Sequence, residues 1–160
     1  MFKNTLEVIE LVEAFEQCKL TKSEWTHAAH LTVGLYYCLR FPFGKAINIM
    51  RDGITWLNDS HGLPNTDNSG YHETLTVFWM ITIKQFTETS KCVNLADLAN
   101  QLVTTFSDTD LPLRYYSVEL LFSTAARRHH VPPDLDRFYL FSNVAKLATR
   151  VGGETSFCFY

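Results

Sequence analysis

Four residues in two short segments have the types and the spacing that could hold a metal ion. His27 and His30 stand three residues apart, which places both imidazoles on one face of a helix. His72 and Glu73 are neighbours in a second segment. Three imidazoles with an open coordination position are a common plan for a catalytic metal, and two histidines with a carboxylate are a set that iron favours.

Both ligand sets predict a small metal-dependent enzyme that acts on a small molecule. In the first set, His27, His30 and His72 bind a divalent ion such as Zn, Fe, Mn or Ni, and Glu73 is a general base or orients a ligand. In the second set, Glu73 binds the ion directly. Hydrolysis and oxygen-dependent chemistry both fit such a site, and Glu73 is the predicted catalytic residue.

Aromatic side chains close to these segments are expected to line an apolar pocket for the substrate. The aromatic residues of this pocket are Trp25, Tyr71 and Trp79. The helical face that begins at His72 continues through Leu75, Thr76, Trp79 and Ile83. Gly34 lies one turn after His30 and is expected to leave empty space where a larger residue would fill the cavity.

The same residues also have ordinary structural explanations. His27 and His30 could be polar surface on an early turn, and Glu73 could be an acid that the helix dipole favours near an N-terminus. The rival function is a non-catalytic helical module that binds a small ligand or a partner protein, with structural histidines. The four cysteines form no C-x-x-C and have no histidine at a recognisable spacing, so nucleophilic catalysis is not predicted.

Apolar residues recur at three- and four-residue steps along most of the chain, the pattern of amphipathic helices. These steps predict helices over 4–18, 21–40, 42 to about 60, 71–90, 94–106 and 117–130, with one more after Pro133. Thr21 and Glu24 have the spacing of a capping box, so the second helix is expected to begin at Thr21. Segment 71–90 is rich in β-branched residues, but its length favours a helix, and its apolar character on all sides predicts a buried, central one.

The chain as a whole predicts an all-α fold, a compact bundle of six or seven helices in a single domain over residues 1–160. Its 160 residues are 46% hydrophobic, enough for a core, and no repeat or linker divides them. The net charge of −3 and the absence of a basic stripe argue against a nucleic-acid partner. We expect no membrane span and no signal peptide, and so a cytoplasmic protein with free thiols. A homo-oligomer is compatible with these features.

Two segments together resemble a group of small, mostly bacterial, uncharacterised helical proteins with no settled activity. They are Trp25 to Leu31, which reads W-T-H-x-x-H-L, and Gly70 to Thr76, which reads G-Y-H-E-T-L-T. The resemblance implies that the two histidine segments belong to one site. A looser, architectural similarity is to metal-binding helical bundles of the DinB type, which use three histidines. Their later histidine motif is missing here unless His129 or His130 replaces it.

Overall fold

A computed structural model describes residues 1–135 of the chain, and in this part every regular element is a helix. The elements are α1 (Thr5–Glu16), α2 (His27–Arg40), α3 (Phe43–Ser60), α4 (Glu73–Thr89), α5 (Leu95–Thr105), the 3-10 helix η1 (Leu111–Arg114), α6 (Val118–Leu121) and α7 (Thr124–Arg128). The predicted all-α bundle of six or seven helices is therefore confirmed. The helix predicted after Pro133 falls on residues 136–160, outside the described part.

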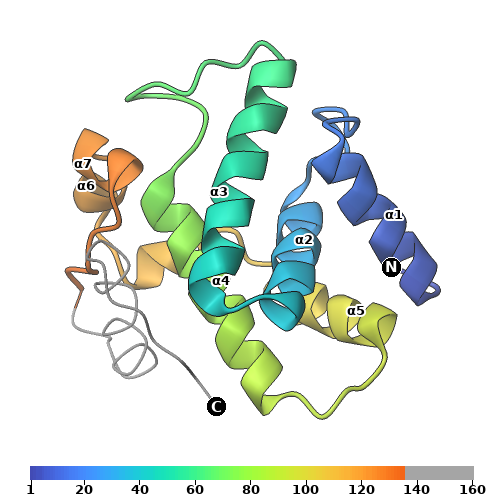
Figure 1. Cartoon of the computed structure of the whole chain (residues 1–160). Coiled ribbons are helices and arrows are strands. Elements are labelled where there is room, and N and C mark those ends of the chain that lie inside the picture. The colour runs from blue at the N-terminus through green and yellow to red at the C-terminus, as the bar shows by residue number, and fades with distance from the viewer. Residues whose placement is uncertain (136–160) are drawn as a thin grey trace.

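Helices α2 and α4 form the centre of the bundle. The two pack against each other; α2 also contacts α1, α3 and α5, and α4 also contacts α3 and α7. Figure 1 shows α3 running across α2 and α4, with α1 and α5 on one side and the short helices α6 and α7 on the other. Each central helix buries eight residues. The prediction that segment 71–90 is a buried, central helix is confirmed, and α2 shares that position.

Gly34 explains how closely the two central helices approach. A Cβ at this position would lie 2.7 Å from Ile83 Cδ1 and 3.1 Å from Met80 Sδ, both on α4. The missing side chain thus makes room for α4, and the packed interior leaves no gap there. The expectation that Gly34 leaves cavity space was wrong, because side chains of α4 fill that space.

The predicted start of α2 was also wrong. Thr21 and Glu24 do pair, with Thr21 N–H donating to Glu24 Oε2 over 2.8 Å, but they close a turn that ends before the helix. The N-cap is Thr26, whose hydroxyl accepts from Ala29 N–H. His27 is therefore the first residue of α2, and its ring lies at the end of the helix.

A second correction concerns the predicted helix over 117–130. Ser117, where the predicted helix begins, caps a helix, but this helix, α6, ends at Leu121. Ser123 then caps α7, with its hydroxyl accepting from Ala126 N–H. Two short helices stand where one was predicted, because a second serine offers the backbone a new start.

Two further expectations from the sequence concern the cysteines and membrane-spanning helices. The described cysteines, Cys18, Cys38 and Cys92, are free thiols. No helix within residues 1–135 is both long enough and apolar enough to cross a bilayer.

Candidate functional site

A cavity of about 310 Å³ lies between the three helices α2, α3 and α4, next to the end of the loop that leads into α4. Its apolar wall is made of Met50, Ile54, Tyr71, Leu75, Trp79, Met80 and Ile83, and its other lining residues are His27, His30, Gly70, His72 and Thr76. The two predicted histidine segments therefore meet at one cavity. The face predicted to follow His72 along α4 forms one of its walls.

His27 is the first residue of α2, and two contacts hold its ring. Its Nε2–H donates to the carbonyl oxygen of Phe106 over 2.8 Å. Its ring also meets the indole of Trp79 edge-on, with centroids 4.6 Å apart. Because the Nε2 atom carries the proton in this arrangement, Nδ1 of a neutral His27 is an acceptor.

His30 lies one turn further into the fold, and its ring lines the cavity without a hydrogen bond to any residue of the described chain. Its ring packs on Trp25 with centroids 3.8 Å apart. Burial, and secondarily the charge of His27, lower the pKa of His30 to about 3. The imidazole is therefore neutral at pH 7, with one N–H donor and one acceptor nitrogen.

This lowered pKa makes the fold sensitive to mild acid. Below pH 6.5 the unfolded chain takes up a proton at His30 that the folded chain refuses, so stability falls as the pH drops towards 3. Between pH 7 and pH 5 the loss from this residue is about 2 kcal/mol. Urea unfolding at the two pH values should show a smaller loss for His30→Leu than for the wild type, while the exposed-site control His129→Gln keeps the wild-type loss. Equal losses in the wild type and His30→Leu would contradict this assignment.

His72 is held by the backbone at both ring nitrogens. Its Nε2–H donates to Leu121 O over 2.8 Å, and its Nδ1 accepts from Leu75 N–H over 3.3 Å, which caps α4. Burial lowers the pKa of His72, so the neutral tautomer that makes both bonds is favoured. In this position, His72 joins α4 to α6 and has no nitrogen left for a metal ion.

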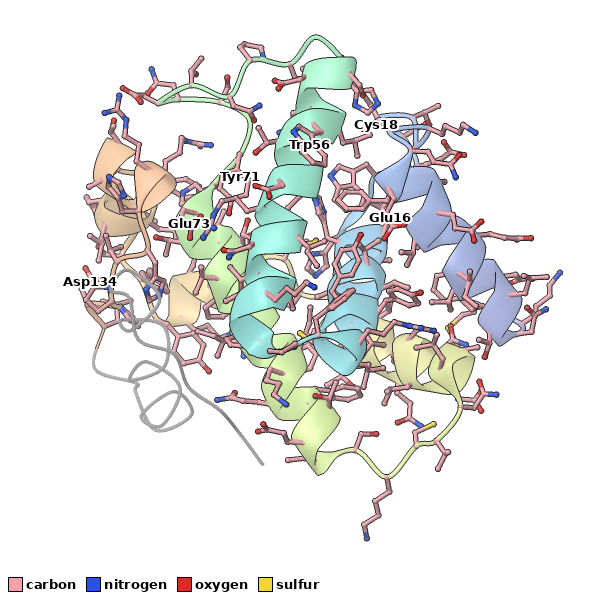
Figure 2. All side chains as sticks on the ribbon, viewed as in Figure 1. Glu16, Cys18, Trp56, Tyr71, Glu73 and Asp134 are labelled. Carbon is pink, nitrogen blue, oxygen red and sulfur yellow. The ribbon has the colours of Figure 1, made fainter. Side chains whose placement is uncertain are left out.

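Glu73, the predicted catalytic residue, is part of an ion pair that faces α3. Arg51 donates from Nε to Oε2 over 2.8 Å and from Nη2 to Oε1 over 2.6 Å, and the Tyr71 hydroxyl donates to Oε2 over 2.7 Å. Burial alone would raise the pKa of Glu73, but these hydrogen bonds outweigh it and leave the pKa lowered. Figure 2 shows Tyr71 and Glu73 beside one another at the start of α4.

Both carboxylate oxygens of Glu73 thus have donors, and Glu73 is absent from the residues that line the cavity. Glu73 instead anchors the hydroxyl of Tyr71, and Tyr71 lines the cavity. The role of Glu73 as a base or ligand stays a prediction. The geometry gives it the role of a positioning residue for Tyr71.

Of the three predicted pocket aromatics, Tyr71 and Trp79 line the cavity and Trp25 does not. Trp25 lies behind His30 and stacks on Phe15, with ring centroids 4.6 Å apart and planes 20° apart. A row of three rings, Phe15, Trp25 and His30, therefore runs from α1 to the cavity. Trp25 supports the site through His30.

Several site residues were missed by sequence reasoning. They are Met50 and Ile54 of α3, Met80 of α4, and Arg51, the partner of Glu73. The apolar spacing of α3 marks Met50 and Ile54 as buried but does not say against which helix. Arg51 lies 22 residues before Glu73, and no local signal links them.

Within residues 1–135, no group of three or more His, Cys, Asp or Glu side chains is arranged so that it could hold a metal ion. His27, His30 and His72 all line the cavity, but both ring nitrogens of His72 are hydrogen-bonded to backbone groups. The divalent ion predicted on these three residues stays a prediction.

Comparisons with protein-family models, with curated proteins and with solved structures found no match for this chain. The site must therefore be interpreted from its own geometry.

Proposed function

We propose that this chain binds a small, uncharged, largely apolar molecule in the cavity between α2, α3 and α4. The observation that carries the proposal is the cavity itself, about 310 Å³ in volume and walled mainly by aliphatic, aromatic and thioether side chains. Binding pockets for small molecules begin at roughly 300 Å³, and an apolar cavity of ~150 Å³ is enough for benzene. Small aromatic or aliphatic compounds are therefore the size class that fits.

The lining also favours an uncharged ligand. No Lys, Arg, Asp or Glu is among the lining residues in the described part of the chain, and the charges of Arg51 and Glu73 neutralise each other outside the lining. His30, with its pKa lowered to about 3, adds no charge at pH 7. A charged ligand would lose its hydration without a counter-ion, which is costly.

Binding is favoured over catalysis by the properties of His30 and Cys38. A general base works best when its pKa lies near the working pH, and the pKa of His30 lies far below it. Burial raises the pKa of Cys38 to about 12, and Cys38 does not line the cavity, so no activated thiol serves it. The rings on the wall are suited to recognition.

The direct test is calorimetric titration of the untagged protein with toluene. We expect binding at one site, and a loss of affinity of at least tenfold in Leu75→Trp, because a larger side chain at Leu75 fills part of the cavity. The matched control is Leu39→Trp, on the exposed side of α2, which should bind like the wild type. No measurable toluene binding, or equal binding by Leu75→Trp, would contradict the proposal.

A second candidate is the metal-dependent site that the sequence predicted. Two observations support it. His27 and His30 line the same cavity one turn apart. His27 also donates its Nε2–H to a backbone carbonyl, as metal-binding histidines commonly do. In this candidate His27 and His30 supply two ligands, and His72 joins them only by releasing a backbone hydrogen bond.

Metal analysis of untagged protein, as purified and after dialysis against Zn²⁺ or Co²⁺, separates the two candidates. Near-stoichiometric metal that is lost in the His27→Ala, His30→Ala double variant would support the metal site. Metal-free protein with unchanged stability in that variant would exclude it, and toluene binding would then be the remaining function of the cavity.

A further inference from the structure

We infer that the molecule bound in the cavity carries a hydroxyl group, as in an uncharged phenol or alcohol, and that His30 is its hydrogen-bond partner. This inference rests on the proposed binding function and names the ligand class and the contact. It follows from which polar atoms on the cavity wall already have partners and which do not.

Two polar side chains of the wall, His72 and Tyr71, are already engaged by the protein. His72 uses both ring nitrogens for backbone groups. The Tyr71 hydroxyl donates to Glu73 and also contacts the side chain of Thr76. These groups fix the shape of the cavity and are not free to recognise a ligand.

His30 is different, because its ring lines the cavity and no residue of the described chain hydrogen-bonds it. The His30 ring is partly buried, and a ligand that supplies a hydrogen bond recovers the part of its hydration that burial removes. Trp25, stacked in turn on Phe15, covers the ring with its indole. The His30 ring, which lines the cavity, is thereby held beside the space that a ligand would occupy.

The ring atoms that the two histidines still have free select the ligand group. Neutral His30 offers one donor and one acceptor, and a hydroxyl can satisfy either because it both donates and accepts. The Nε2–H of His27 is engaged with the carbonyl oxygen of Phe106, so only Nδ1 of its ring is left for a ligand. A ligand that could only accept would leave these acceptors unpaired, whereas a hydroxyl can donate to one of them.

The test compares three ligands that share one ring: p-cresol, toluene and p-toluate. In calorimetric titrations at pH 7, we expect wild-type protein to bind p-cresol about tenfold more tightly than toluene, and p-toluate not measurably. In His30→Leu the advantage of p-cresol should fall to about twofold or less, while toluene binding is retained. His30→Gln, which keeps a donor and an acceptor, should restore part of the advantage and guards against a general loss of fold.

Equal affinities of p-cresol and toluene for the wild type would overturn the inference and leave the cavity function standing. A p-cresol advantage that survives in His30→Leu but disappears in His27→Leu would overturn the assignment to His30. Failure of all three ligands would contradict the cavity function, and the inference with it.

Discussion

Phe15→Ala is expected to lower the free energy of unfolding by about 3–5 kcal/mol, the usual cost of removing a fully buried aromatic ring. Phe15 is 1% exposed and stacks on Trp25. It also fills the space beside Gly53 of α3, where a Cβ would lie 2.5 Å from its Cε1 atom. The ring therefore joins α1 to α3 and supports the row of rings that ends at His30.

Urea unfolding at pH 7 measures this loss. The control is Phe122→Ala, in which the ring removed is 57% exposed, and its effect should stay within about 0.5 kcal/mol. A loss below about 1 kcal/mol for Phe15→Ala would show that the ring does not hold α1 against the core.

Arg51→Ala is expected to cost about 2–3 kcal/mol, because it leaves the Glu73 carboxylate, with a side chain only 11% exposed, without its counter-ion. This expected loss lies at the low end of the cost of breaking a buried ion pair. The reason is that the Arg51 side chain is 34% exposed, so water already screens part of the interaction. Loss of Arg51 also weakens the hold of Glu73 on Tyr71, so a lower toluene affinity should accompany it.

The pH dependence of this variant has a definite sign. The stability that Glu73 gains from its lowered pKa is present above the unfolded value of 4.5 and is lost as the pH falls through its folded value. The difference between the wild type and Arg51→Ala should therefore narrow as the pH falls further below 4.5. The control is Arg114→Ala, which removes an ion pair whose side chains are 62% and 48% exposed and should cost at most about 1 kcal/mol. Equal losses from the two variants would contradict a structural role for the Arg51–Glu73 pair.

The sequence was most informative where the signal is local. The predicted helices over 4–18 and 94–106 begin at Asn4 and Asn94, and these two residues cap α1 and α5, because an asparagine before an apolar run satisfies the free amides of the first turn. The prediction of a helix start from sequence was wrong where two capping signals compete within a few residues. Thr21 and Thr26 both offer a capping oxygen, and the helix begins at Thr26, with Trp25 just before it packed on Phe15.

The candidate site was also predicted only where local spacing carries the signal. Spacing alone placed His27 and His30 on one face, and both line the cavity with Tyr71 and Trp79. What spacing could not show is the partner of each group. His72 binds a carbonyl 49 residues away, which a sequence pattern of histidines cannot reveal.

The most direct test of ligand binding in this cavity is a crystal structure of untagged protein soaked with 4-iodophenol, with anomalous data recorded for the iodine. We expect iodine in the cavity near Leu75 and Trp79, with the phenol oxygen about 3 Å from a ring nitrogen of His30. No iodine in the cavity, or a phenol whose hydroxyl points away from His30 to another partner, would contradict this expectation.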